Sequence, residues 1–342
     1  MEHAQQPSIQ LPPTGSRIAE KYIIEKELGR GGMGAVFLAR HEVTGRPVAI
    51  KWMLPTFAHD AQAVARFVRE AKLAAAVNHE NVVDIYDVGS DEKGFYLIME
   101  FLRGRSLADR LEQGPMTLPE FLAVMRGVCA GLAAAHHAGI VHRDLKPDNI
   151  FLAEARNDSA NVIPKIVDFG VSKAATHTDS HARLTGTGVA MGTPHYMSPE
   201  QVYSAADAGP QSDIYSLGVI AYEALSGALP HDGDTVAAII VRVATEEPIP
   251  IRSLVPGLNL DVANAIHRAL AKKPQDRYQT VGEFFAALSG RNTLSEALAA
   301  TIATPPGFQH SDSPPRNGGG ARESSDASLL PSTAEPPGPS TV

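Results

Sequence analysis

The sequence predicts an α+β protein with two unequal lobes: a small antiparallel β-rich lobe that carries one main helix, and a larger, mostly α-helical lobe. Strand-like runs separated by turn residues dominate the chain up to about residue 101, and helix-length apolar patterns dominate it from about residue 102. Hydrophobic residues make up 44% of the 342-residue chain, which is enough to fill the cores of one large or two ordinary domains.

The β-rich lobe is expected over about residues 18–101. Its strand-like runs are separated by a glycine turn and by the short loop HEVTG. These runs are 22–40, which contains the glycine turn, 46–54, 82–89 and 94–101. Residues 61–77 place apolar side chains at i, i+3 and i+4 spacing, which predicts a helix with one buried face.

The helical lobe is expected over about residues 102–290. Six segments have the length and apolar spacing of helices: 106–113, 118–139, 212–227, 234–245, 260–272 and 281–290. Residues 1–17 are rich in Pro and Gln, and residues 291–342 are rich in Pro, Gly and Ser. Such segments cannot bury enough apolar area to offset the entropy of ordering, so both are expected to be disordered.

Composition excludes several classes of protein. The formal net charge of -8 argues against a basic nucleic-acid-binding surface. The single cysteine, Cys129, lies in an Ala-rich helical run, so it can form neither a disulfide within the chain nor a thiolate metal site. No apolar run approaches the ~18 residues of a membrane span, and the first 15 residues do not resemble a signal peptide. We therefore expect a cytoplasmic protein that binds neither membrane nor nucleic acid.

The run HRDLKPDN, which ends at Asn149, and the tripeptide Asp-Phe-Gly, which begins at Asp168, together indicate phosphoryl transfer. That reaction needs a carboxylate to align the acceptor hydroxyl and take its proton, and Asp144 is the candidate. Lys146 would neutralise the moving phosphoryl group. Asn149 and Asp168 supply the hard oxygen ligands that magnesium prefers. Asp-Phe-Gly alone would more often be an ordinary turn.

The run GRGGMGAV begins at Gly29 and lies between two predicted strands. A glycine cluster in isolation is more often a hairpin turn than a phosphate site. Its position between strands excludes the dinucleotide-binding motif and favours a hairpin that closes over phosphates with its backbone N–H groups. Leu28, Val36 and Ala49 would then present apolar surface to an adenine ring.

These motifs, in this order and with VAIK ending at Lys51, resemble the protein kinase superfamily, and more closely the bacterial serine/threonine kinases of eukaryotic (Hanks) type. The resemblance covers roughly Tyr22 to Ser289. It implies a bilobal kinase fold, ATP and Mg²⁺ as cofactors, and transfer of the γ-phosphoryl group to protein serine or threonine. Lys146 and the downstream pair Gly192 and Thr193 resemble serine/threonine rather than tyrosine kinases.

The expected nucleotide-binding residues come from the glycine hairpin, the following strand and the end of the run 94–101. They are Leu28, Gly29, Arg30, Gly31, Gly32, Met33, Gly34, Ala35, Val36, Ala49, Lys51, Glu100 and Leu102. Lys51 would hold the α- and β-phosphates. Glu70 could be a surface charge beside Arg66 and Arg69, but the resemblance favours its pairing with Lys51.

The segment from Asp168 to Glu200 has the length of an activation loop. Its hydroxyls could be ordinary loop residues, but Arg143 could pair with a phosphate on the loop and order it. Thr185 and Thr187 resemble the autophosphorylation positions of bacterial relatives. The resemblance also implies an ion pair between Glu200 and Arg277.

Ser198, Pro199 and Glu200 occupy the place of the family's usual Ala-Pro-Glu, a small substitution that we expect to be harmless. Asp213 precedes an apolar helical run and is consistent with a helix cap. The resemblance implies that it also holds the backbone around His142.

The main hypothesis is thus an active kinase that acts on protein substrates bearing serine or threonine, including its own activation loop, with a homodimer as one route to autophosphorylation. A pseudokinase scaffold that binds nucleotide is disfavoured because Lys51, Asp144, Asn149 and Asp168 are all present. A small-molecule phosphotransferase of the same fold is disfavoured by the complete activation segment.

Overall fold

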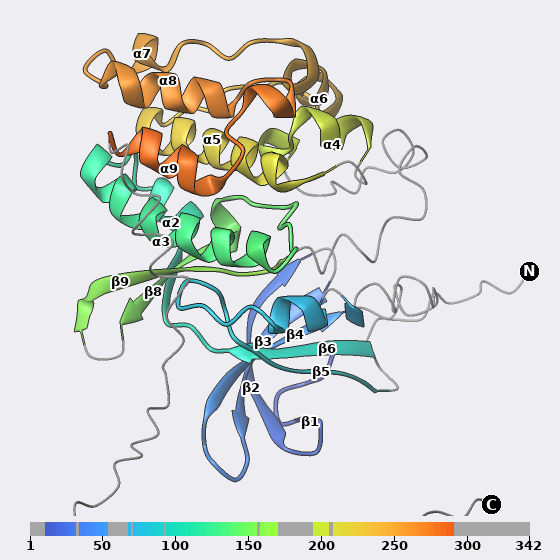
Figure 1. Ribbon diagram of the computed structural model, residues 1–342. Helices are drawn as coiled ribbons and strands as arrows, with labels where there is room; N and C mark the ends of the chain where they lie inside the picture. The colour runs from blue at the N-terminus through green and yellow to red at the C-terminus, as the bar shows by residue number, and fades with distance from the viewer. Residues whose placement is uncertain are drawn as a thin grey trace, which may run out of the picture. The chain divides into compact units, whose positions relative to one another are not determined.

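The computed structural model describes residues 11–31, 34–53, 68–69, 71–91, 94–155, 158–169, 194–204 and 208–290 (Figure 1). The chain divides into two compact units, Met1–Ala303 and Thr304–Val342, and every described residue lies in the first. The predicted disorder of residues 1–10 and of the tail 291–342 therefore lies outside the described residues. Residues 11–17, which the prediction included in the disordered segment, are described by the structure, and the Gly15 amide donates to the Ile24 carbonyl at 2.8 Å.

The strands of the amino-terminal lobe are β1 (Arg17–Ile18), β2 (Tyr22–Gly31), β3 (Gly34–His41), β4 (Pro47–Met53), β5 (Ile85–Asp91) and β6 (Gly94–Glu100). They form one antiparallel sheet in the order β1-β2-β3-β4-β6-β5. All four predicted runs thus contain strands, although the third begins at Ile85 rather than at residue 82.

The sheet is buried on both faces, which explains why β4 is almost continuously apolar. One face packs around Phe37, Ile50 and Trp52, and the indole of Trp52 stacks on Tyr96 with ring centroids 5.8 Å apart. The other face carries a second apolar cluster that includes Ala49. The register pairs Val36 with Lys51 across β3 and β4. Residues that pair directly on neighbouring antiparallel strands point to the same face of the sheet, so the side chains of Val36 and Lys51 lie on one face.

The predicted helix over residues 61–77 is only partly within the described residues. Residues 68–69 and 71–75 are helical, and Ala71 and Ala74 are buried. The loop that follows the helix joins the lobes: the Ile166 amide donates to the Asn81 carbonyl at 2.8 Å, and the Val83 amide donates to the Ile166 carbonyl at 3.0 Å.

A second sheet, with three antiparallel strands, was not among the predicted elements. It consists of β7 (Gly104–Ser106), β8 (Ile150–Ala155) and β9 (Asp158–Ile166), in the order β7-β8-β9. Figure 1 shows β8 and β9 between the six-stranded sheet and the helices. The strand β8 follows directly on the HRDLKPDN run, so it fixes the carboxyl end of that run.

The other described elements of the carboxy-terminal lobe are helical, in agreement with the expected mostly helical lobe. The α-helices are α2 (Leu107–Leu111), α3 (Leu118–His137), α4 (Pro199–Tyr203), α5 (Pro210–Ser226), α6 (Val236–Thr245), α7 (Ile251–Leu254), α8 (Leu260–Ala269) and α9 (Val281–Leu288). Side-chain oxygens of Thr117, Thr235 and Thr280 accept backbone N–H groups at the starts of α3, α6 and α9.

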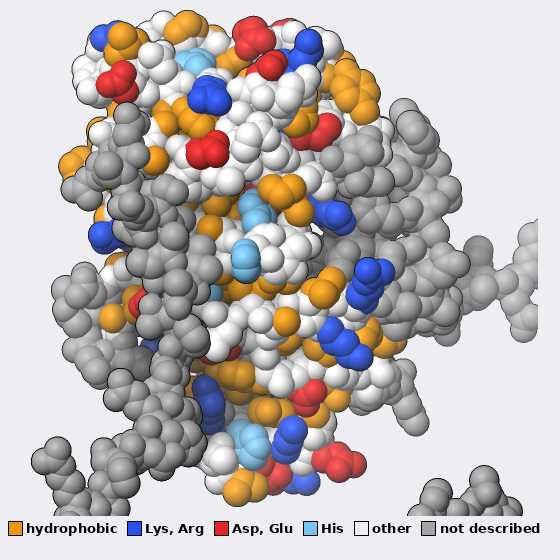
Figure 2. Space-filling view, viewed as in Figure 1, with side chains coloured by type: hydrophobic (Ala, Val, Ile, Leu, Met, Phe, Trp, Pro, Cys, Tyr) orange, Lys and Arg blue, Asp and Glu red, His pale blue; other side chains and the backbone are white. Residues whose placement is uncertain are grey.

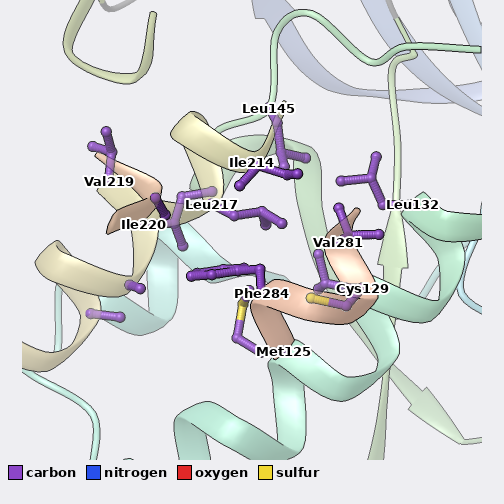
Figure 3. Packing of buried hydrophobic residues seen from close by; sticks show 14 of the residues in the cluster. Met125, Cys129, Leu132, Leu145, Ile214, Leu217, Val219, Ile220, Val281 and Phe284 are labelled. Carbon is purple, nitrogen blue, oxygen red and sulfur yellow. The ribbon is translucent and has the colours of Figure 1, made fainter. Parts of the chain in front are cut away.

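Helices α3, α5 and α9 enclose the main hydrophobic core (Figure 3). Met125, Cys129 and Leu132 of α3 are fully buried against residues of the other two, including Phe284. The expectation that no apolar run approaches the length of a membrane span is wrong for α3, which with 20 residues and a mean hydropathy of 1.4 is long and apolar enough to cross a membrane. Its contacts with α5 and α9 account for that composition, because they bury its apolar face inside the lobe.

The loop that joins the lobes packs closely on α3. A Cβ atom added at Gly131 would lie 2.7 Å from the Asn81 carbonyl oxygen, whereas one added at Gly257 would meet open space. We predict that Gly131→Ala destabilises the protein by ~1–3 kcal/mol, because backbone must move to admit the methyl group.

Chemical denaturation of Gly131→Ala and of the control Gly257→Ala measures this effect. The control is expected to change the free energy of unfolding by less than ~0.5 kcal/mol. A Gly131→Ala protein that is as stable as wild type would show that the loop is not closely docked.

Candidate functional site

A pocket of about 610 Å³ opens between the glycine hairpin, the segment after β6, and the strands β8 and β9. The predicted nucleotide-binding residues on its wall are Leu28, Gly29, Val36, Ala49, Glu100 and Leu102. The predicted metal ligand Asp168 lies on the same wall. Most of this lining is apolar, as a binding site for a flat heteroaromatic ring requires.

The glycine hairpin connects β2 and β3, where Gly31 pairs with Gly34. Gly34 has φ of +156°, and a Cβ atom there would lie within 1.8 Å of the Trp52 carbonyl oxygen, so only glycine fits. Five of the described residues predicted to contact nucleotide do not line the pocket, namely Arg30, Gly31, Gly34, Ala35 and Lys51. Ala35 is buried in the sheet, and the guanidinium of Arg30 forms an exposed ion pair with Glu27 at 2.8 Å. Gly32 and Met33 lie outside the described residues.

Lys51 projects from β4 toward Asp168, with its Nζ 2.8 Å from Oδ1 of the carboxylate. Burial opposes ionisation of Asp168, but the positive charges around it, the Lys51 ammonium foremost, together outweigh burial and lower the pKa of the carboxyl below its ordinary value. The carboxylate is therefore anionic at neutral pH. Glu70, the expected partner of Lys51, lies outside the described residues.

Hydrogen bonds connect the loop that carries Asp144 to the strand that leads to Asp168. The Asn149 amide nitrogen donates to the Asp144 carbonyl at 2.7 Å. The Asn149 carbonyl in turn accepts the Val167 amide at 2.9 Å. The ammonium of Lys146 also helps to lower the pKa of Asp168. Lys146 on the loop and Asp168 after the strand are therefore close enough to interact electrostatically.

The carboxylate of Asp213 accepts hydrogen bonds from the backbone of the loop that carries Asp144. It is fully buried on α5 and accepts the backbone amides of His142 and Arg143, both at 2.8 Å. His136 Nε2 lies 2.7 Å from the same carboxylate. Arg143 is held in a left-handed conformation with φ of +63°, which is uncommon outside glycine and costs energy. Asp213 thus sustains a strained loop.

The expectation that Asp213 caps its helix is wrong. Helix α5 begins at Pro210 with Gly209 as the N-cap residue, one turn before Asp213. Proline is favoured at the first helical position because it lacks an N–H group. The buried carboxylate is therefore free to hold the loop, as the family resemblance implied.

A model of the protein kinase domain matches residues 22–285 of this sequence. The chain belongs to the protein kinase family. Among curated proteins, this kinase domain is 41% identical to serine/threonine-protein kinase Pkn1 of Myxococcus xanthus, over 86% of the chain and 40% of that protein. It is 38% identical to PknB of Mycobacterium tuberculosis, over 80% of the chain and 43% of that protein.

The chain thus spans less than half the length of these curated relatives. Among solved structures, a mutant PknI kinase domain of Mycobacterium tuberculosis aligns with a TM-score of 0.66 at 24% identity. That alignment covers 82% of this chain and 99% of the other, and it shows the bilobal kinase fold.

The far end of the activation segment is fixed to the helical lobe of the kinase domain. Glu200 forms a two-pronged ion pair with the fully buried Arg277, with both N···O distances 2.8 Å, as the family resemblance implied. Gln201 links this segment to the catalytic loop, because its amide nitrogen donates to the Arg143 carbonyl at 2.8 Å. Ser198 donates to the Gln201 side chain, so the serine found here adds a contact.

The metal ligands expected in the kinase domain fit a hard divalent cation. The amide nitrogen of Asn149 is used by the Asp144 carbonyl, so the oxygen is the atom that can coordinate. The carboxylate of Asp168 is anionic. Within the described ranges, no group of three or more His, Cys, Asp or Glu side chains could hold a metal. A cation here would therefore take other ligands from phosphate and water, as Mg²⁺ commonly does.

Sequence reasoning missed five apolar residues of the pocket: Val83, Met99, Phe101, Phe151 and Val167. Met99 pairs with Ala49 across β4 and β6, so the strand register could have indicated its position. Phe151 lies two residues after Asn149, on the strand that sequence analysis did not assign. Apolar residues carry no chemical signature, and only the fold distinguishes pocket wall from core.

The activation segment between the described residues 169 and 194 includes Thr185, Thr187, Gly192 and Thr193. All four lie outside the described residues. The assignment of Thr185 and Thr187 as phosphorylation sites stays a prediction.

We predict that Arg277→Met destabilises the kinase domain by ~3–5 kcal/mol at pH 7, because it leaves the Glu200 carboxylate partly buried without its partner. The matched control is Arg17→Met, which breaks an exposed ion pair with Glu42 and is expected to cost at most ~1 kcal/mol. Denaturant unfolding of both variants measures the difference.

The effect should depend on pH. Burial alone would raise the pKa of Glu200, but its hydrogen bonds with Arg277 and Ser212 lower it below the ordinary 4.5. The stabilisation is therefore complete above pH 4.5 and is lost as the pH falls through the lower pKa of the folded state. A cost of Arg277→Met that stays constant down to pH 3 would contradict this account.

Proposed function

We propose that this chain is an ATP-dependent serine/threonine protein kinase, which transfers the γ-phosphoryl group of Mg-ATP to protein hydroxyls. The observation that carries the proposal is the meeting of Lys51 and Asp168, 2.8 Å apart, beside an apolar pocket. The loop with Asp144 joins the same region through Asn149. A cation, an anion and a candidate base are thus held around the end of a nucleotide-sized pocket.

Each part of this arrangement has a role in phosphoryl transfer. The apolar walls hold adenine, and Lys51 holds the phosphates so that the γ-phosphorus faces the catalytic loop. Asp144 aligns the acceptor hydroxyl and takes its proton late in the step. Lys146 offsets the charge on the moving phosphoryl group. Asn149 and Asp168 would hold a magnesium ion, which would supply positive charge to neutralise part of the phosphate charge.

The substrate class follows from the family and from Lys146. The kinase family implies protein substrates, and the serine/threonine kinases among the relatives support serine or threonine as acceptors. Autophosphorylation of the activation segment, with or without a homodimer, and a cytoplasmic location of this domain complete the proposal. The formal net charge of -8 supports the expectation that nucleic acid is not a partner, and on the face drawn in Figure 2 Asp and Glu lie at both ends of the domain along with Lys and Arg.

The pseudokinase alternative fits the site less well. A scaffold that only binds nucleotide has no need for a strained loop around Asp144, the candidate general base. Yet the backbone of Arg143, the preceding residue, is held at φ +63° by a buried carboxylate. Strain of this kind is maintained at working sites. A small-molecule phosphotransferase has no need for Glu200 and Arg277 to fix the end of an activation segment.

We predict that Lys51→Met and Asp144→Asn each lower kcat/KM for phosphoryl transfer by at least ~100-fold while the protein stays folded. The measurement is transfer of labelled phosphate from ATP with magnesium to a generic basic protein and to the chain itself. Matched controls are Lys26→Met and Asp261→Asn, which change exposed residues of the same types. Equal labelling by Asp144→Asn and wild type would remove the proposed base.

We also predict that Asp213→Asn lowers kcat by ~10- to 100-fold with little change in KM for ATP. An amide replaces one acceptor oxygen with an N–H donor, which would face a backbone amide and displace the catalytic loop. Asp234→Asn, at an exposed position, is the control. If Asp213→Asn keeps full kcat, the buried carboxylate does not position the loop.

A further inference from the structure

The residue that follows the Ser-Pro-Glu run, Gln201, uses both ends of its side chain. It is the third residue of α4, and its Oε1 accepts the backbone N–H of Ser198 at 3.0 Å and the Ser198 hydroxyl at 3.1 Å. A contact from the third helical residue back to the N-cap backbone is half of a capping box. Because a backbone N–H can only donate, this contact identifies the oxygen of the amide and leaves its NH₂ group pointing the other way.

The NH₂ end of the same side chain reaches the loop that carries the candidate base. Nε2 of Gln201 donates to the Arg143 carbonyl at 2.8 Å. That carbonyl belongs to the peptide group between Arg143 and Asp144, so the hydrogen bond holds the peptide that leads directly into the base. The N–H of this peptide faces Nδ1 of His142 at 3.3 Å, which is a longer contact.

Arg143 is held on both sides of its left-handed backbone, which has φ of +63°. Rotation about φ and ψ turns the peptide before a residue relative to the peptide after it. Oδ1 of Asp213 accepts the Arg143 N–H at 2.8 Å and fixes the first of these peptides. Gln201 fixes the second through its carbonyl. Both hydrogen bonds of Asp213 lie before the Arg143 Cα atom, so they do not by themselves set the direction in which the chain enters Asp144.

The short helix that carries Gln201 is itself firmly fixed. The preceding residue, Glu200, pairs with the buried Arg277 at two N···O distances of 2.8 Å and accepts the Ser212 hydroxyl at 2.6 Å. Two adjacent residues thus have different tasks: one ties the end of the activation segment to the helical lobe, and the next contacts the catalytic loop. The position of the segment and the orientation of the loop are therefore linked.

Helix capping alone does not account for this side chain. A capping contact uses Oε1 and leaves the NH₂ group to water, whereas here Nε2 binds a residue 58 positions away in the sequence. A cap would affect the stability of α4. A contact on the peptide before the base would instead affect the rate of transfer in molecules that are already folded.

We propose that Gln201 is a positioning residue that orients Asp144 by holding the Arg143 carbonyl, and that it thereby couples the end of the activation segment to the candidate base. The inference rests on the proposed function, since it names a determinant of the transfer rate at the same site. Gln201 does not line the nucleotide pocket, so nucleotide affinity should not depend on it. It acts through the peptide group that it holds.

The test measures the rate constant of a single turnover, with the full chain in excess over labelled Mg-ATP and a generic basic protein as acceptor. Under these conditions the rate constant reports only folded molecules that hold ATP, and an unfolded fraction does not lower it. Gln201→Leu should lower the rate constant about fivefold to tenfold, the scale of one lost hydrogen bond. The Kd for ADP, measured by calorimetry, should stay within about twofold of wild type.

A second variant removes the donor alone. Gln201→Glu keeps the length of the side chain and the acceptor for Ser198, but it places an oxygen against the Arg143 carbonyl. It should lower the rate constant at least as much as Gln201→Leu, and it keeps the proposal testable if the leucine variant fails to fold. Gln113→Leu, which changes an exposed glutamine that does not line the nucleotide pocket, should behave as wild type.

A double-mutant cycle tests whether Gln201 acts through Asp144. In the Asp144→Asn background, Gln201→Leu should change the residual rate constant by less than about twofold, because the carboxylate that it orients is already gone. Loss by the same factor in both backgrounds would overturn the proposal, since it would show that the glutamine acts independently of the base.

Other outcomes separate this proposal from the proposed function. If wild type transfers phosphate and both Gln201 variants transfer it at the wild-type rate, the positioning role is overturned and the kinase assignment stands. A raised Kd for ADP with an unchanged rate constant would also overturn it, because the residue would then act on the nucleotide pocket. If wild type neither binds ADP nor transfers phosphate, the proposed function fails, and this inference fails with it.

Discussion

The buried carboxylate of Asp213 is the interaction on which the rest of the site depends. It accepts two successive backbone amides of the catalytic loop at 2.8 Å and is itself fully shielded from water. Hydrogen bonds to a charged acceptor in such surroundings are strong, and their loss would strand the charge. These hydrogen bonds offset the energetic cost of the left-handed backbone conformation of Arg143 and thereby determine where Asp144 and Asn149 lie.

The same helix positions the other edge of the site. Ser212 of α5 donates to Glu200 at 2.6 Å, and Ser216 donates to the Tyr196 carbonyl at 2.8 Å. Both the catalytic loop and the end of the activation segment are thus held by polar side chains on one buried, otherwise apolar helix. Elements on a rigid scaffold hold geometry more closely than loops that support one another. The hydrophobic core around α5 is therefore also what aligns the chemistry.

Much of this could be read from the sequence, for physical reasons that also explain the failures. Long helices such as α3 repeat their apolar pattern over several turns, whereas strands as short as β7 offer too few residues for a pattern. Asp168 was identified from the Asp-Phe-Gly motif downstream of HRDLKPDN, and Lys51 from the VAIK strand that follows the glycine hairpin. The role of Asp213 came from the family resemblance, since a carboxylate near a helix start looks like a cap until the true start at Pro210 is known. The ion pair between Lys165 and Glu100 joins residues that are 65 positions apart in the sequence. The residues around either one form no pattern that predicts the contact.

The burial of Cys129 has a practical consequence. It is the single cysteine of the chain, it is fully buried in the core, and burial raises the pKa of its thiol. Because alkylating reagents attack exposed thiolates, the folded domain behaves as a cysteine-free background. Cysteines introduced at exposed sites on the two lobes would accept spin labels or fluorophores selectively, so the opening and closing of the lobes can be followed in solution without first removing a native thiol.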